Sequence, residues 1–220
     1  MMIVDMHVHT NKFSSCSKLS PEEAILEAKQ NGLDGICITE HDVMWDRKEI
    51  DSLREKHDFW VFPGVEVNTN FGHILVYGLK GWSKDRYLQR GFAPYFPFME
   101  LKRIADSTGA FTAASHPFRE PGYIQEGYGG YQLTVSPEDV LDRTVFRMVD
   151  GIEGFNGQSS PKENTMSYLV AQALDIPALG GSDAHFGKEI GSGATIFPQR
   201  FNRETEFLHM LKNGSFRIRE

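Results

Sequence analysis

The segment Met1-Met2-Ile3-Val4-Asp5-Met6-His7-Val8-His9 begins as an apolar strand and ends in two histidines. In an extended chain, residues i and i+2 face the same side, so His7 and His9 can grip one ion. A second apolar run closes with the same spacing in Ser182-Asp183-Ala184-His185. Two distant strands that each end in a ligand pair predict a metal site at the edge of a sheet.

Short apolar runs alternate with amphipathic segments along the 220 residues. Most runs are apolar throughout, as expected for strands covered on both faces. About seven strands in one such chain favour an α/β barrel over an open sheet, with Phe59–Leu79 allowed as a hairpin. The strand candidates are Met1–Met6, Gly35–Thr39, Phe59–Val65, Ile74–Leu79, Ala110–Ser115, Gly151–Phe155 and Ala178–Ser182.

Helix boundaries between these runs are well marked. Serine, proline and an acidic residue start helices at Ser20-Pro21-Glu22-Glu23 and Ser160-Pro161-Lys162-Glu163, and Ser136-Pro137-Glu138-Asp139 is close to this design. Gly32 and Gly109 stand where helices are expected to end. We therefore expect one domain over residues 1–220.

The overall composition excludes several classes. The formal net charge of -7 makes a nucleic-acid polymer an unlikely partner, because such proteins normally carry a basic face. No segment approaches the ~20 apolar residues of a membrane span. The N-terminus lacks the pattern of a signal peptide, and two cysteines, Cys16 and Cys37, suggest no disulfide framework. These features predict a cytoplasmic protein.

Imidazoles and carboxylates gather at the strand ends. A lone histidine after a strand is usually a loop or core residue, but six of the eight histidines take such positions, and only His57 and His209 lie on predicted helices. In parallel barrels the C-terminal strand ends form the active face. The metal-ligand candidates are His7, His9, Glu40, His41, Glu66, His73, His116, Asp183 and His185. Nine candidates suit two or three divalent transition metal ions, with zinc, manganese or iron favoured by the mixed donor set.

Four motifs in this order resemble those of the PHP (polymerase and histidinol phosphatase) superfamily of metal-dependent phosphoesterases. They are Asp5-x-His7-x-His9, Thr39-Glu40-His41-Asp42, Ser115-His116-Pro117 and Ser182-Asp183-Ala184-His185. The segments Gly64-Val65-Glu66 and Gly72-His73 match the intervening region. The resemblance covers nearly the whole chain and implies a distorted seven-stranded (β/α)7 barrel, usually with a trinuclear site.

The resemblance also implies how the ligands are shared. The first ion would take His7, His9, Glu66 and Asp183, and the second would take Glu66, His73 and His116. The third would take Glu40, His41 and His185. Many relatives have aspartate in place of Glu40, and many have a Ser-Asp-Gly stretch where this chain has Ser14-Ser15-Cys16-Ser17-Lys18.

The expected chemistry is hydrolysis of a phosphate ester. Bound metal lowers the pKa of water from ~15.7 toward ~7, so a hydroxide bridging two ions could attack phosphorus. Arg119 is the candidate phosphate clamp, with a plain surface arginine as the alternative. Lys18, Arg86 and Arg90 are weaker candidates, and Asp5 is expected to orient a ligand imidazole.

The preferred function is a phosphatase acting on a small nucleotide, sugar or histidinol phosphate. The alternatives are a phosphodiesterase or 3′ exonuclease, a non-catalytic metal-stabilised module, and an amidohydrolase, although no lysine lies at these strand ends. A homo-oligomer stays open. The aromatic stretches Gly81–Phe98 and Phe118–Val135 are expected to be long loops that serve either packing and subunit contact or a substrate lid.

Overall fold

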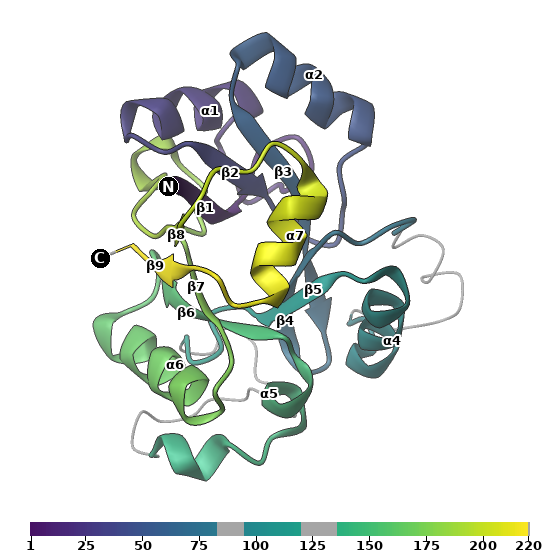
Figure 1. Cartoon of the computed structure of the whole chain (residues 1–220), viewed down its shortest axis with the longest axis vertical. Coiled ribbons are helices and arrows are strands. Elements are labelled where there is room, and N and C mark those ends of the chain that lie inside the picture. Colours follow the sequence, from purple (N-terminus) through teal and green to yellow (C-terminus); the bar gives the residue numbers. More distant parts are fainter. Residues whose placement is uncertain (83–94, 120–135, 220) are drawn as a thin grey trace.

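The computed structural model describes residues 1–82, 95–119 and 136–219, and its centre is one curved sheet (Figure 1). The strand order is β7-β6-β5-β4-β3-β2-β1-β8-β9. The first seven strands therefore lie in chain order, which confirms the barrel-like fold. Their bounds are β1 Met2–Val8, β2 Gly35–Ile38, β3 Trp60–Thr69, β4 Gly72–Tyr77, β5 Phe111–Ala114, β6 Gly151–Asn156 and β7 Ala178–Gly181.

The sheet nearly closes where β7 meets β1. The backbone amide of Asp183 donates to the carbonyl of His7 at 2.7 Å, and the amide of His9 donates to the carbonyl of Ala184 at 3.0 Å. The two ligand-bearing strand ends are thus held side by side by backbone hydrogen bonds. Two short strands that the sequence did not predict, β8 Thr195–Phe197 and β9 Arg217–Ile218, extend the sheet beyond β1.

The barrel is distorted because β4 runs antiparallel to both of its neighbours. Strands β3 and β4 form the expected hairpin, with Asn68 opposite His73. A crossover helix is absent here, so β4 runs against its neighbours and His73 enters the active face from the start of a strand. Glu66 lies inside β3, which runs past the predicted strand end at Val65, and the other ligand candidates lie near or beyond the C-terminal ends of strands.

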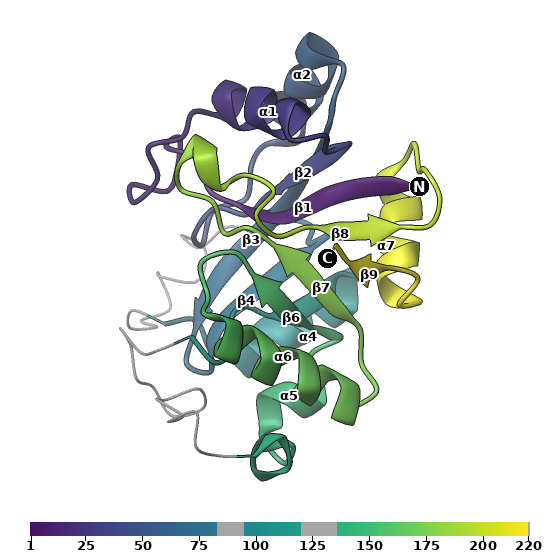
Figure 2. The same cartoon turned by 90° about the vertical axis from the view of Figure 1, so that its left-hand side faces the viewer.

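Helices cover the outside of the barrel, and one helix closes its far end (Figures 1 and 2). Apolar residues of α1 and α2 pack on β1 and β2, while residues of α4, α5 and α6 pack over the β3–β6 side. Helix α7 lies at the end where β1 begins, and Phe207 packs against interior residues such as Phe62 and Tyr77. The helices are α1 Pro21–Gln30, α2 Arg47–His57, α4 Phe98–Thr108, α5 Thr144–Met148, α6 Pro161–Ala173 and α7 Glu204–Lys212.

The predicted helix starts have different outcomes. Complete capping boxes at Ser20 and Ser160 begin α1 and α6, as expected. The Ser136 motif begins only the short 3-10 helix η1 Pro137–Val140, and a second one, η2, spans Gly187–Glu189. Gly109 ends α4 in the left-handed conformation with φ 71°.

Three further expectations concern the surface and the thiols. Among the described residues, no helix is long and apolar enough to cross a membrane. Cys37 is buried and Cys16 is exposed, and both are free. Most of the two aromatic stretches, residues 83–94 and 120–135, lies outside the described residues, so their proposed lid role stays a prediction.

Candidate metal centre

His7 and His9 stand at the end of β1 with their rings turned to the same side. A register irregularity between Asp5 and Val8 interrupts the regular pairing of β1 with β2. Both histidines are fully buried, and their Nε2 atoms lie 2.9 Å apart. The i, i+2 prediction for this pair is therefore matched by a close approach of two imidazole nitrogens.

Glu66 lies at the centre of the imidazole cluster. Its Oε1 lies 3.0 Å from His73 Nδ1 and 3.0 Å from His116 Nε2. Its Oε2 lies 3.4 Å from His7 Nε2, 3.2 Å from His9 Nε2 and 3.0 Å from His41 Nδ1. The two oxygens thus face two different sets of imidazoles, which is the arrangement of a bridging carboxylate.

Asp183 faces the same cluster from β7. Its Oδ1 lies 3.4 Å from His7 Nε2, 3.2 Å from His9 Nε2 and 3.7 Å from His185 Nδ1. Its Oδ2 is 3.9 Å from His116 Nε2. Asp183 therefore sits beside the same pair of histidines as Oε2 of Glu66.

The backbone is strained at three of these strand ends. Asp42, His116 and Asp183 have positive φ angles of 58°, 28° and 54°. Such conformations cost roughly 1–3 kcal/mol each and persist only when the surroundings enforce them. Here the backbone amides of Asp42 and Asp183 donate to the carbonyls of Glu66 and His7 at 2.8 and 2.7 Å. Strain gathered around the imidazole cluster is typical of a functional site.

Three overlapping groups of these residues bring their ligand atoms within 4.8 Å of one another. His9, His41 and Glu66 each belong to two groups, and of these three only Glu66 has two ligand atoms with which neighbouring ions could be bridged. The groups are His7/His9/Glu66, His9/His41/His185 and His41/Glu66/His73.

The donor set fits divalent transition metals. Within the part of the chain that the structure describes, the buried Oε2 of Glu66 accepts no hydrogen bond of good geometry, although three imidazoles surround it. A buried carboxylate oxygen without a donor is costly unless a cation satisfies it. Imidazole and carboxylate together suit zinc, iron or manganese.

Charge pairing changes the pKa values in this cluster. Burial lowers the pKa of His7, but the carboxylates of Asp183, Glu153 and Glu66 outweigh it and raise that pKa well above 6.5. The pKa values of His9 and His73 are raised in the same way against burial. Burial raises the pKa of Glu66, but the nearby imidazoles, His73 first, hold it well below 4.5. The site is therefore a dense cation–anion cluster that bound ions would reorganise.

The pKa values of His116 and His185 are lowered instead of raised. Burial and the neighbouring Arg119 lower the pKa of His116 below 6.5. Burial and His9 lower the pKa of His185. A lowered pKa favours the neutral imidazole, which is the form that binds a metal.

The sequence profile of the PHP domain family matches residues 5–117. The chain belongs to the PHP domain family. A second profile, described as PHP-associated, matches residues 161–216. The resemblance inferred from the motifs is thereby confirmed, and no relative was found among curated proteins.

Solved structures share this fold at low identity. A two-domain Bacteroides vulgatus protein containing a predicted PHP-like metal-dependent phosphoesterase is 21% identical with a TM-score of 0.67; the alignment covers 99% of this chain and 64% of that chain. A putative metal-dependent phosphoesterase from Bifidobacterium adolescentis is 16% identical with a TM-score of 0.59, covering 84% and 88%. Endonuclease Q in complex with an abasic duplex is 14% identical with a TM-score of 0.59, covering 96% and 56%.

Glu40 of this PHP domain lies in a hydrogen-bond network beside the cluster. Its carboxylate accepts from the Thr10 amide at 3.1 Å, from Trp45 Nε1 at 3.1 Å, and from the hydroxyls of Thr10 and Ser14. Ser14 Oγ in turn lies 3.3 Å from His9 Nδ1. Glu40 belongs to none of the three ligand groups among the described residues, and its assignment to a third ion stays a prediction.

Asp5 is buried below the cluster, and burial raises its pKa to about 6. Its described hydrogen bonds come from the backbone amides of Ser182 at 2.8 Å, Gly191 at 2.9 Å and His7 at 3.2 Å. These bonds tie β1 to the end of β7 and to the segment before β8. The expected contact of Asp5 with a ligand imidazole is not among them.

Glu153 contacts the imidazole of a candidate metal ligand, and the sequence analysis did not predict this contact. Its Oε1 lies 2.9 Å from His7 Nδ1, and its side chain is fully buried. The sequence did hold a signal, since Glu153 is a single carboxylate inside the apolar run Gly151–Phe155. Buried charges are rare unless they are paired.

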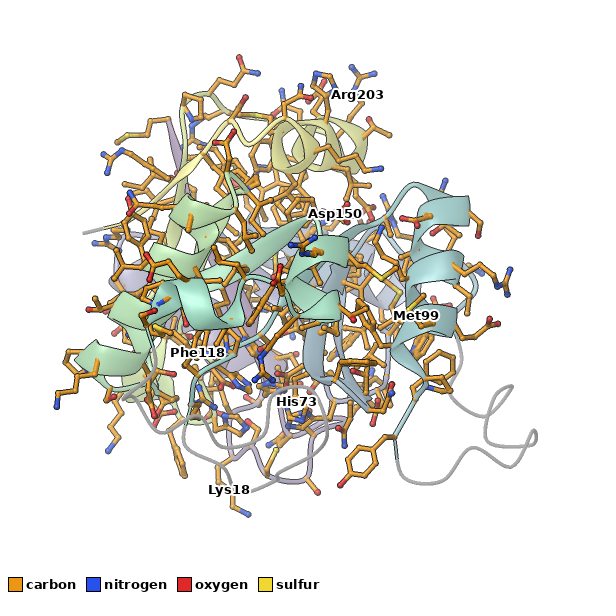
Figure 3. The ribbon with its side chains drawn as sticks, turned by 90° about the horizontal axis from the view of Figure 1, so that it is seen from below. Lys18, His73, Met99, Phe118, Asp150 and Arg203 are labelled. Carbon is orange, nitrogen blue, oxygen red and sulfur yellow. The ribbon has the colours of Figure 1, made fainter. Side chains whose placement is uncertain are left out.

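Arg119 reaches the cluster from the segment that follows β5. Its Nη2 lies 2.7 Å from Asp183 Oδ2 and also donates to Asn156 Oδ1. Its Nε donates to Ser159 Oγ at 3.4 Å, and about a quarter of the side chain (28%) is exposed. Lys18 lies on the same side of the molecule as His73 (Figure 3), while Arg86 and Arg90 lie outside the described residues.

Proposed function

We propose that this PHP domain is a metal-dependent phosphomonoesterase acting on a small-molecule phosphate ester, such as a nucleotide, sugar or histidinol phosphate. The observation that carries the proposal is Glu66, whose two oxygens face two separate sets of imidazoles. We also propose that residues 1–220 act as one domain and that all nine predicted ligands belong to its metal site. The free thiols of Cys16 and Cys37 support the proposal of a cytoplasmic protein.

Two or three zinc, manganese or iron ions would act as Lewis acids and lower the pKa of water to near neutrality. His7, His9, Glu66 and Asp183 would hold the first ion, and Glu66, His73 and His116 the second. His41 and His185, with Glu40, would complete a third position. The strained backbone at His116 and Asp183 fixes the direction of these side chains before substrate arrives, which is the preorganisation that catalysis requires.

Arg119 supports a phosphoryl group as the recognised part of the substrate. Its guanidinium is already held beside Asp183, and a planar fork of donors matches phosphate oxygens. In this proposal Asn156 positions Arg119 from behind. The partly exposed side chain leaves donors for one phosphoryl group, as a monoester needs.

A phosphodiesterase or nuclease is the second candidate, because Endonuclease Q shares the fold. The net charge of -7 and the 23 basic against 30 acidic residues weigh against a long polyanion. A non-catalytic metal-stabilised module is the third candidate, and the strained, partly open site weighs against it. The homo-oligomer stays an open prediction.

The test is a competition between a mononucleotide and a labelled oligonucleotide at low and high salt, with metal-loaded protein. We expect faster hydrolysis of the mononucleotide and a weak dependence on salt. Arg119→Ala should lower kcat/KM for the monoester roughly 10- to 100-fold, the loss of one charged hydrogen bond, without loss of metal. Lys188→Ala, on η2, is the matched control cation. Preferential, salt-sensitive cleavage of the oligonucleotide would favour the nuclease instead.

A further inference from the structure

Glu153 joins the two halves of the imidazole cluster from below. Its Oε1 lies 2.9 Å from His7 Nδ1. Its Oε2 accepts from the backbone amide of His116 at 2.8 Å, from Asn156 Nδ2 at 3.0 Å and from Ser115 Oγ at 3.2 Å. His7 belongs to the proposed first ion position and His116 to the second, so one carboxylate contacts both.

The contact with His7 selects one tautomer of the imidazole. An ionised carboxylate only accepts hydrogen bonds, so His7 must carry a proton on Nδ1. In the neutral imidazole that a metal requires, the lone pair of Nε2 is then free, and Nε2 is the atom that lies beside Glu66 Oε2 and Asp183 Oδ1. Metal-bound histidines commonly donate their other N–H to a carboxylate in this way, which fixes the ring and raises its basicity.

The contact with His116 holds a strained backbone. His116 has a φ of 28°, which a residue with a side chain adopts at a cost of roughly 1–3 kcal/mol. The hydrogen bond from its amide to Glu153 offsets part of that cost. With the backbone held there, His116 Nε2 lies 3.0 Å from Glu66 Oε1.

Asn156 extends the network to the proposed phosphate clamp. Its Nδ2 donates to Glu153 Oε2 at 3.0 Å and to Asp183 Oδ2 at 3.4 Å, while its Oδ1 accepts from Arg119. Glu153, Asn156 and Arg119 thus form a continuous chain of hydrogen bonds that runs from the buried Glu153 to the partly exposed Arg119.

We propose that Glu153 is a positioning residue that sets the tautomer of His7 and the backbone of His116, and so couples the first and second ion positions. The inference rests on the proposed metal site. It assigns a role to a residue that contacts the ligands and need not contact substrate.

Glu153→Gln provides a sharp test because the amide has one acceptor and one donor group. If the NH2 group took the place of Oε2, it would face two donors that cannot become acceptors, the His116 amide and Asn156 Nδ2. It is therefore expected to replace Oε1 and face His7. Nδ1 must then accept and Nε2 must carry the proton, which blocks the lone pair meant for the ion.

We expect Glu153→Gln to bind zinc about 10- to 100-fold more weakly than wild type in competition with a chromogenic chelator. In the zinc-loaded proteins, the Nδ1–H resonance of His7 should be present in wild type and lost or shifted in Glu153→Gln. Glu153→Asp keeps an acceptor-only group and should retain that resonance with a smaller loss of affinity. The matched control is Asp150→Asn, just before β6. It neutralises the carboxylate that accepts from the amide and the hydroxyl of Thr112 on β5, and it should leave zinc affinity unchanged.

Different results would overturn different claims. A wild-type protein that binds none of zinc, manganese and iron would overturn the proposed function, and the inference would fall with it. A wild-type protein that binds zinc, beside a Glu153→Gln protein with equal affinity and the same His7 resonance, would overturn the inference alone. If Glu153→Gln does not fold, Glu153→Asp decides: full zinc affinity with His7 protonated on Nε2 would contradict the proposal.

Discussion

The two ends of the barrel share the same strands but carry opposite chemistry. On β3, Phe62 and Glu66 are four residues apart and lie on the same face of the strand. Phe62 packs against Phe207 of α7 with ring centroids 4.4 Å apart, whereas Glu66 is surrounded by imidazoles. Figure 3 shows His73 at the imidazole end and Arg203, next to α7, on the opposite side.

One end of the strands therefore carries residues that stabilise the fold by apolar burial, and the other end carries the candidate metal ligands. A buried cluster of charges costs desolvation energy, and its attractions recover that cost only with good geometry. The aromatic end gains free energy from apolar burial, with Phe197, Phe201 and Phe207 almost fully buried. Strain at His116 and Asp183 therefore lies at the opposite end of the barrel from the aromatic residues that pack against α7.

The largest effect is expected at the imidazole end. Glu66→Gln removes the charge of the one carboxylate that faces both sets of imidazoles, so metal and activity should be lost together. The loss of activity should exceed the ~10- to 100-fold typical of residues outside the ligand shell. Elemental analysis and kcat are the measurements, with circular dichroism to confirm an unchanged fold. Full activity in this variant would remove Glu66 from the site.

A substitution at the aromatic end should lower the free energy of unfolding and leave metal binding unchanged. Phe207→Ala opens a cavity between α7 and the barrel and should lower the free energy of unfolding by about 3–5 kcal/mol. Phe186→Ala, at an exposed position on the active face, should change it by less than about 0.5 kcal/mol. Chemical denaturation measures both. A Phe207→Ala protein that loses its metals while folded would break the proposed separation of the two ends.

A smaller effect is expected on thermal stability. The stability of the metal-free protein should fall as pH rises, whereas the stabilisation by bound metal should grow. The pKa values of His7, His9 and His73 are raised above 6.5 in the metal-free protein, so their ion pairs stabilise it fully below that value. This stability is lost as pH rises through the raised pKa values. Metal binding instead requires neutral imidazoles and strengthens as pH rises.

Thermal unfolding with chelator and with added manganese at about pH 6 and about pH 8 measures this contrast. The metal-free melting temperature should fall with pH, while the stabilisation by manganese should grow. Parallel pH dependences in the two samples would show that the imidazoles do not bind the ions.

The sequence predicted the imidazole end better than the contacts behind it. The spacing of His7 and His9 and the apolar runs of the strands are patterns within a few neighbouring residues. The seven strands and the histidines near their ends could therefore be predicted from short stretches of sequence. Glu153 was missed because its partner His7 lies 146 residues away in the chain. The strands β8 and β9 were missed because they span only three and two residues.

Similar local signals also gave different structures. Serine followed by proline and acidic residues began α1 and α6, but at Ser136 it began only a four-residue 3-10 helix. The chain turns there after Val140, where the amide of Arg143 donates to the carbonyl of Val140 at 3.1 Å, and α5 starts separately. A cap motif fixes where a helix can start, whereas tertiary packing decides how far it runs.

Metal content tests the central claim most directly. Protein reconstituted with manganese, iron or zinc and freed of excess ion should hold two or three ions per chain by elemental analysis. His7→Gln should hold fewer ions, and His209→Gln, at an exposed position on α7, should match wild type. A value near zero in the wild-type protein would contradict the assignment of the imidazole cluster as a metal centre.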